Sequence, residues 1–165
     1  MRYNLDAVRR LVYYKDGKIF NRVKRKWCRL GVGDEIGFID KSSGYVMVTI
    51  MNASIRVHRL VWEMHNGPIP DGMEVDHINH IRHDNRIENL RVVTKQVNGR
   101  NQSKKANNKS GHTGVSFVKS RGSWNARITG NGKRINLGNF KSKADAIAAR
   151  LEAEKQYNYH DNHGV

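Results

Sequence analysis

Cysteine is almost absent from the 165-residue sequence, which contains only Cys28. A single cysteine cannot close a disulfide within the chain, and it excludes zinc sites built from four cysteines or from two cysteines and two histidines. No apolar run approaches the ~18 residues that a membrane span needs, and the first residues lack the apolar core of a signal peptide. We therefore expect a soluble, cytoplasmic protein without a membrane partner.

Acidic residues are also scarce, because 15 Asp and Glu stand against 30 Lys and Arg and give a formal net charge of +15. Eleven of the 15 acids precede position 90, whereas residues 91–141 contain twelve basic residues and no acid. This surplus predicts a polyanionic partner, most simply nucleic acid, and the acid-free stretch is expected to follow a phosphate backbone. Coiled-coil heptads are absent, so no obligate protein partner is expected.

Short strands are predicted throughout the first part of the chain. Apolar runs separated by glycine turns predict a hairpin over 11–20 and a strand over 44–50 with a partner at 54–57. A helix is expected over 58–65. Two further strands, at 74–77 and 90–93, enclose a polar loop rich in His, Asp and Asn. Thr94 is the expected N-cap of the helix that follows.

The last third of the chain predicts a separate small module. Residues 103–112 have the polar, basic composition of a linker. Within 113–158, three short strands alternate apolar with polar or basic residues, and a helix begins with a cap at Ser142. We expect the apolar face of this sheet to pack on the helix, and we assign 159–165 to a tail. The helix side expected to face the sheet carries Ala144, Ile147, Ala148 and Leu151.

The polar loop concentrates side chains suited to metal-assisted hydrolysis. Asp76 and His77 are neighbours at the end of a predicted strand, so they point to opposite faces. One can therefore bind a metal while the other acts on water. Asn89 and Asn98 follow His77 by 12 and 21 residues, and the predicted helix can return Asn98 beside Asp76.

These residues lie within a run, VHRLVWEMHNGPIPDGMEVDHINHIRHDNRIENLRVVTKQVN, that resembles the HNH nucleases, especially phage and intron-borne homing endonucleases. The resemblance covers residues 57–100 and implies two strands, a loop and a helix around one divalent metal. It implies that His77 is the general base and that Asp76 and Asn98 hold the metal. Asn89 would tie the loop together and orient His77. An Asp and Asn oxygen site favours Mg²⁺ or Mn²⁺.

Other residues near this motif allow two interpretations. His80 and His83 continue a His-x-x-His-x-x-His spacing that imitates a zinc cluster, but we interpret them as solvated or phosphate-facing accessory groups. His58 either faces the site from the preceding helix or is a structural histidine. Asn85 is interpreted as a turn residue. Arg91 either contacts a phosphate of the DNA or is an ordinary surface arginine.

A second resemblance covers residues 114–149, GVSFVKSRGSWNARITGNGKRINLGNFKSKADAIAA. This segment is similar to the apetala-two, or ethylene-response-factor, DNA-binding domain, in which an exposed sheet face enters the major groove. By position, Ser116, Val118, Arg127, Thr129, Arg134 and Asn136 would face the bases. Contact with phosphates alone is an equal alternative for each of them. The complete set of residues expected to bind DNA is Arg127, Arg134, Asn136, Thr129, Ser116, Arg91, Lys104 and Lys105.

The segments together predict an α+β fold. N-terminal β-hairpins and a ββα-metal nuclease module occupy residues 1–102, and a three-stranded antiparallel sheet packed on one helix follows the linker. The resemblances imply a phage-encoded, site-specific endonuclease of double-stranded DNA, a homing enzyme able to nick. Two alternatives stay open at this point: a non-catalytic DNA-binding regulator with a decayed nuclease site, and an RNA-binding basic protein.

Overall fold

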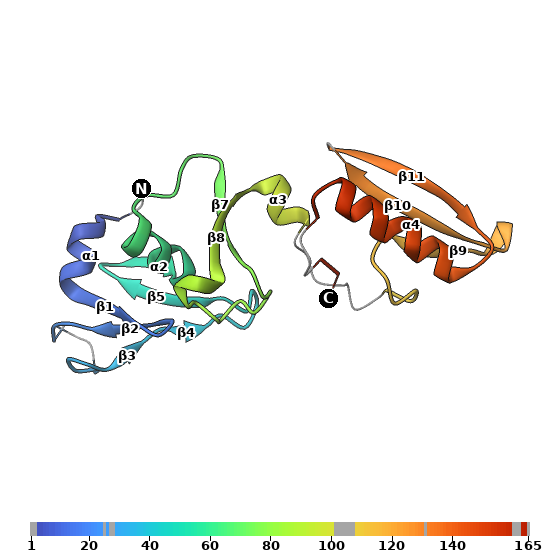
Figure 1. The fold of residues 1–165 in the computed structure, drawn as a ribbon. Helices are drawn as coiled ribbons and strands as arrows, with labels where there is room; N and C mark the ends of the chain where they lie inside the picture. Colours follow the sequence, from blue (N-terminus) through green and yellow to red (C-terminus); the bar gives the residue numbers. More distant parts are fainter. Residues whose placement is uncertain are drawn as a thin grey trace. The chain divides into compact units, whose positions relative to one another are not determined.

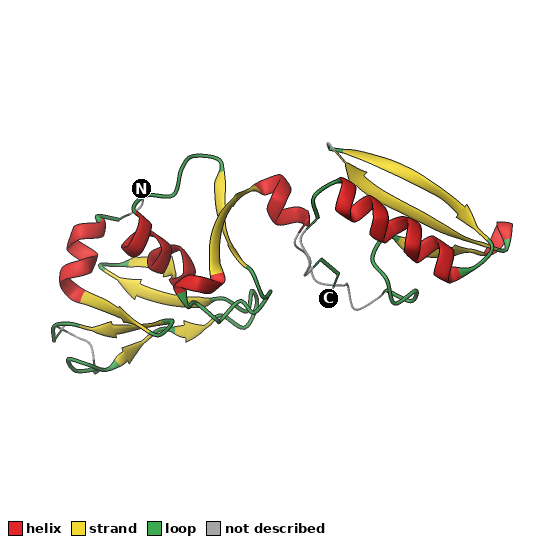
Figure 2. Ribbon diagram, viewed as in Figure 1, coloured by secondary structure: helices red, strands yellow, loops and turns green. Residues whose placement is uncertain are grey.

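A computed structural model describes residues 3–24, 26, 29–100, 108–130, 132–159 and 163–164. The chain divides into two compact units, Met1–Lys95 and Gln96–Val165 (Figure 1). Helices and small antiparallel sheets alternate along both units, which confirms the predicted α+β class (Figure 2). The module boundaries that were predicted at 102, 113 and 158 stay predictions. In the described part of the chain, every helix is too short or too polar to cross a bilayer.

The first unit begins with a helix that the sequence pattern did not predict. Helix α1 (Leu5–Leu11) starts at Asn4, whose side chain accepts a hydrogen bond from the amide of Ala7, and it buries Val8. The predicted hairpin follows as β1 (Val12–Lys15) and β2 (Lys18–Asn21), and β3 (Glu35–Ile36) completes the sheet in the order β1-β2-β3. Seven residues with one cap give a weak helical signal, which explains why it was missed.

A second small sheet leads directly into a helix, as predicted. Strands β4 (Phe38–Ile39), β5 (Val46–Ile50) and β6 (Ala53–Arg56) are antiparallel in the order β4-β5-β6. Helix α2 (Val57–Asn66) begins without a loop after β6 and buries Val57, Leu60 and Val61 in the core of this unit. Gly67 ends α2 at a φ of 80°, a conformation that glycine adopts without strain.

The two remaining strands of this unit carry the polar loop between them. Strand β7 (Met73–His77) pairs antiparallel with β8 (Leu90–Thr94), so Asp76 lies opposite Arg91 and His77 lies opposite Leu90. A short helical turn, η1 (Ile87–Asn89), precedes β8, and α3 (Lys95–Arg100) follows it directly. The elements follow one another as the predicted strand, loop, strand and helix. Helix α2 packs on β7, β8 and η1.

The second unit contains the predicted three strands and helix. Strands β9 (Val115–Val118), β10 (Ser123–Gly130) and β11 (Lys133–Phe140) form an antiparallel sheet in the order β11-β10-β9, and a short turn, η2 (Lys119–Arg121), joins the first two. Helix α4 (Lys143–Gln156) packs on this sheet, and the Ser142 hydroxyl caps it by accepting from the amide of Asp145 at 3.0 Å. The expected alternation is present, because Ala126 and Ile128 are buried whereas Arg127, Thr129, Arg134 and Asn136 are exposed.

The predicted buried side of α4 is wrong. Ala144, Ala148 and Leu151 are exposed and only Ile147 is partly buried, whereas the residues that face the sheet are Ala146, Arg150 and Ala153. Two small alanines let the helix approach the strands closely. Between them, the Arg150 guanidinium donates to the Arg127 carbonyl oxygen at 2.6 Å and to Glu154 Oε1 at 2.7 Å. A hydrophobicity pattern assigns arginine to the surface, so it predicts the wrong side of the helix as buried.

Replacing Arg150 by Met should destabilise the second unit by about 3–5 kcal/mol, because the nearly buried Glu154 carboxylate loses its charged partner. Leu151→Ala on the exposed side is the matched control and should change stability by less than about 0.5 kcal/mol. Urea unfolding of the whole chain, followed by circular dichroism, measures both. Equal effects of the two substitutions would show that Arg150 does not organise this unit.

Candidate active site

Asp76 and His77 are both buried at the end of β7, with relative exposures of 8% and 4%. The antiparallel register brings Arg91 opposite Asp76, and its guanidinium donates from Nε and Nη2 to Asp76 Oδ2 at 3.1 and 3.0 Å. Arg91, which was predicted to contact DNA, is thus an ion-pair partner of the carboxylate in this structure. A DNA contact by Arg91 stays a prediction.

The imidazole of His77 is oriented by Asn85, a residue that was interpreted from the sequence as a turn former. His77 Nε2 lies 3.1 Å from Asn85 Oδ1, and the Asn85 amide nitrogen donates to the carbonyl oxygen of His83 at 3.3 Å. The second bond turns the amide oxygen toward the ring, so His77 Nε2 is the donor. Neutral His77 therefore has its lone pair on Nδ1, which is the nitrogen able to accept a proton.

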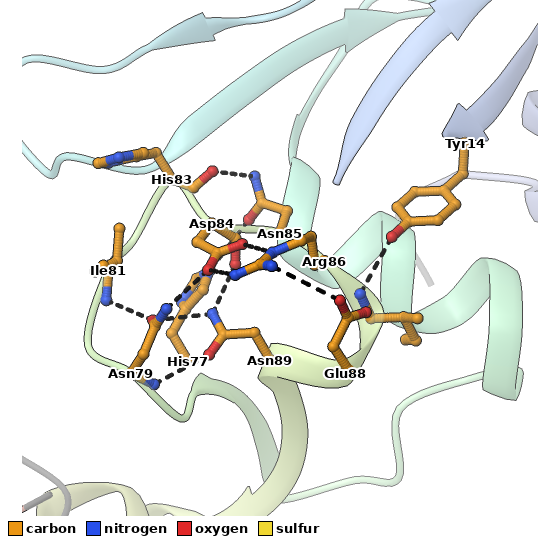
Figure 3. A network of polar contacts seen from close by, with 11 residues as sticks. Tyr14, His77, Asn79, Ile81, His83, Asp84, Asn85, Arg86, Glu88 and Asn89 are labelled. Atoms are coloured by element: carbon orange, nitrogen blue, oxygen red, sulfur yellow. Dashed lines mark hydrogen bonds and ion pairs between the residues drawn. The ribbon is translucent and has the colours of Figure 1, made fainter. Parts of the chain in front are cut away.

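Asn89 closes the loop that carries Asn85 (Figure 3). Its side-chain oxygen accepts from the backbone amide of Asn79 at 3.0 Å, and its amide nitrogen donates to Asn79 Oδ1 at 2.9 Å and to the Asp84 carbonyl oxygen at 2.8 Å. One buried side chain thus joins both ends of the segment 79–84. The expected loop-tying contacts of Asn89 are present, and the hydrogen bond that orients the ring comes from Asn85.

A surface ion pair holds the same loop from outside. Arg86 donates to both carboxylate oxygens of Asp84 at 2.8 Å, and these hydrogen bonds hold the pKa of the Asp84 carboxyl well below its usual range. The backbone of Arg86 also packs against Gly17 in the β1–β2 turn, where a Cβ atom would lie only 3.1 Å from the Arg86 amide nitrogen. The loop therefore rests on the first hairpin.

Burial keeps His77 and its neighbour His58 neutral. The two rings lie 4.9 Å apart between centroids in an edge-to-face arrangement, and Tyr45 contacts both. Desolvation, followed by the proximity of His77, lowers the pKa of His58 to about 3. Desolvation also lowers the pKa of His77. His77 is therefore unprotonated near neutral pH, as a general base must be.

The oxygen donors near His77 fit a hard divalent cation that takes few protein ligands. Within the described residues, no group of three or more His, Cys, Asp or Glu side chains is arranged to hold a metal. Mg²⁺ needs no such group, because it is commonly bound by one or two protein oxygens together with water and substrate phosphates. Asp76 can supply one oxygen. Asn98 is partly buried on α3 in the second unit, and its place beside Asp76 stays a prediction.

The remaining predicted residues belong to both units, and the surroundings of each are described within its own unit. His58 contacts His77, as one of its two interpretations required. His80 is partly buried and has a φ of 64°. His83 is exposed, and its ring points away from His77 (Figure 3). Ser116 is partly exposed on the outer sheet face, where Asn136 Oδ1 accepts from Asn125 at 2.7 Å. Lys104 and Lys105 lie outside the described residues.

Asn85 is the site residue that sequence reasoning missed. Neighbouring asparagines and aspartates are common in turns, so nothing in the residue type singled it out. Its nearly complete burial, at 1% exposure, was the missing information, because a buried amide must find hydrogen-bond partners. Only the folded loop shows that one of those partners is the imidazole.

Comparisons with known proteins find one nuclease family model and two phage proteins that resemble this chain. A family model described as HNH endonuclease matches residues 56–100. Protein 3.8 of Escherichia phage T7 is 38% identical over 82 residues, which cover 50% of this chain and 68% of that protein. The uncharacterized gene 5.3 protein of Enterobacteria phage T3 is 51% identical over 39 residues, which cover 24% of this chain and 39% of that protein. No solved structure matches. The C-terminal resemblance to the apetala-two domain finds no support in these comparisons.

Replacing Asn85 by Leu should release the His77 ring from a single tautomer, because leucine has similar volume but no acceptor. Histidine ¹⁵N NMR should show the Nε2–H form in the unaltered protein and a mixture in the variant. The lost bond should also cost about 1–3 kcal/mol of stability. Asn85→Asp retains an acceptor and should keep the Nε2–H form. An unchanged His77 spectrum in Asn85→Leu would contradict this assignment.

Proposed function

The chain belongs to the family of phage T7 protein 3.8 and carries an HNH endonuclease domain, and on this basis we propose that it is a metal-dependent, site-specific endonuclease of double-stranded DNA. The observation that carries the proposal is the geometry at His77, a buried neutral imidazole fixed by Asn85 next to the Asp76 carboxylate. Phage relatives support action on DNA inside an infected bacterial cell. We further propose a homing-type enzyme, as the resemblance of residues 57–100 implies.

His77 would activate the nucleophile. Nδ1 accepts a proton from water as the water oxygen attacks the scissile phosphorus, and the hydrogen bond from Nε2 to Asn85 stabilises the imidazolium that forms. Asn89 keeps the loop closed so that this orientation persists. Asp76 and Asn98 would hold Mg²⁺ or Mn²⁺, and Arg91 would fix the Asp76 carboxylate. The bound cation would supply charge stabilisation to the phosphate and to the leaving 3′ oxygen.

The second unit would add affinity and sequence choice. Its exposed sheet face carries Arg127, Thr129, Arg134 and Asn136, with Ser116 at one side, and α4 covers the opposite face. An arginine can read guanine and an asparagine can read adenine in the major groove. Lys104 and Lys105 would add phosphate contacts. The sheet of three strands on one helix supports the apetala-two-like assignment, which we retain as part of this proposal.

One catalytic centre in each chain favours nicking. A single base and a single metal site can hydrolyse one phosphodiester bond in each binding event. Cleavage of both strands would need two chains or two successive events.

The Arg91–Asp76 ion pair favours one rival function, a DNA-binding regulator, because the pair reduces the charge that Asp76 offers to a cation. Activity with and without metal separates the two functions.

Supercoiled plasmid incubated with the purified chain should be nicked with Mg²⁺ or Mn²⁺ and should stay intact with EDTA. His77→Ala should cleave about 100- to 10,000-fold more slowly while still binding DNA, because only the general base is lost. Asp76→Ala and Asn98→Ala should lose metal-dependent cleavage. Leu151→Ala, on the exposed side of α4, is the control and should cleave at the normal rate. DNA binding without metal-dependent cleavage by the unaltered protein would support the regulator instead.

Arg127→Gln and Arg134→Gln should each weaken binding to the cognate duplex by about 1–3 kcal/mol if the arginine reads a base, and binding to other sequences should change little. A contact to phosphate alone would weaken binding to all sequences equally. Fluorescence anisotropy in EDTA with cognate and scrambled duplexes distinguishes the two roles. Lys155→Gln on α4 removes the same charge from the helix that backs the sheet, and it should leave both affinities unchanged. Normal affinity of both arginine variants for every duplex would exclude this face as a DNA surface.

A further inference from the structure

The turn between β4 and β5 is rigid and lies beside the catalytic histidine. Asp40 begins the turn, and its carboxylate accepts hydrogen bonds from the backbone amides and hydroxyls of Ser42 and Ser43. These bonds lower the pKa of Asp40 and keep its charge within the turn. The turn ends at Tyr45, whose ring centroid lies 4.9 Å from that of His58 and 5.9 Å from that of His77.

Two arginines from different elements converge on the Tyr45 ring. The Arg56 guanidinium, at the start of α2, lies 5.1 Å from the ring centroid, and the Arg82 guanidinium, on the loop after β7, lies 5.2 Å from it. Arg82 is fixed further by donating from Nη1 to the Ser43 carbonyl oxygen at 2.7 Å. Its side chain passes Gly44, where a Cβ atom would lie 3.7 Å from Arg82 Cδ.

Among the described residues, neither arginine has an acidic partner. Both residues are exposed, and across the described ranges no carboxylate forms an ion pair with Arg56 or Arg82. The nearby acids are engaged elsewhere, since Asp40 caps its own turn, Asp84 binds Arg86 and Asp76 binds Arg91. Among the described residues, the Tyr45 hydroxyl has no hydrogen-bond acceptor. Two cationic groups at one ring, neither paired with a carboxylate of the described residues, attract an anion to this place.

We propose that Arg56, Arg82 and Tyr45 form a clamp for a backbone phosphate of duplex DNA, next to the phosphodiester bond at which His77 would activate water. This inference rests on the proposed nuclease function, because that function places the DNA backbone at His77. Planar guanidinium groups suit phosphate oxygens, and stacking on an aromatic ring orients them before DNA arrives. The clamp would hold the strand in register with the catalytic loop, because Arg82 belongs to that loop.

The clamp is tested first by binding in EDTA, where no cleavage occurs. Arg56→Gln and Arg82→Gln should each weaken binding to a duplex of arbitrary sequence by about tenfold, and each should reduce the slope of log affinity against log salt by about 0.9. Arg82→Lys keeps the charge and should keep the slope. Lys155→Gln, which removes one charge from α4, is the matched control and should leave the slope unchanged. Thermal unfolding of each variant identifies any loss of folding.

Unchanged slopes in folded Arg56→Gln and Arg82→Gln would overturn the clamp, whether or not the protein cuts DNA. Reduced slopes in a protein that never cuts would instead overturn the nuclease function and leave a phosphate site. Where the protein cuts, its cleavage position allows a second test with neutral methylphosphonate linkages placed one at a time around the cut. A linkage beside the cut should weaken binding of the unaltered protein but should not weaken Arg82→Gln further. Additive losses at every position would place the contact elsewhere.

Discussion

The closed loop between β7 and β8 is the constraint on which the candidate site depends. Three asparagine side chains, at 79, 85 and 89, bind backbone and imidazole groups across a segment whose first part has no helix or strand. A buried polar group without a partner costs about 1–3 kcal/mol, so each amide has few alternative positions. The hydrogen bonds of the loop therefore favour one orientation of the His77 ring.

Electrostatics separate the interior of the site from its surface. Inside, burial keeps His58 and His77 uncharged, and Arg91 neutralises Asp76. Outside, Arg56 and Arg82 retain their charges at the Tyr45 ring. A polyanionic strand is thus attracted to the rim of the site, while the base beneath it stays able to accept a proton. Arg56 and Arg82 thus contribute a local positive charge at the site, in addition to the net charge of +15 of the whole chain.

Strong periodic signals predicted the fold well, and isolated polar residues were predicted poorly. Strand β10 alternates clearly, β5 is a short apolar run, and the cap at Ser142 lies where the sequence indicated. The prediction of the buried side of α4 was wrong because Arg150 is buried, whereas its hydrophobicity assigns it to the surface. The role of Asn85 was missed for a related reason, since it comes from His77, a partner eight residues away across an irregular loop. Arginine and asparagine are usually exposed, so the sequence alone does not show that these two side chains are buried.

The sequence alone determined the chemistry that this chain can offer. The order and spacing of Asp76, His77, Asn89 and Asn98 indicated a nuclease motif, and the distribution of charge indicated a nucleic-acid partner, because both depend on residue identity along the chain. The tertiary structure decided which groups meet: Asn85 with the imidazole, Arg91 with Asp76, and each of Arg56 and Arg82 with the Tyr45 ring. These contacts join residues far apart in the sequence through turns and strand registers, so they exist only once the backbone has folded.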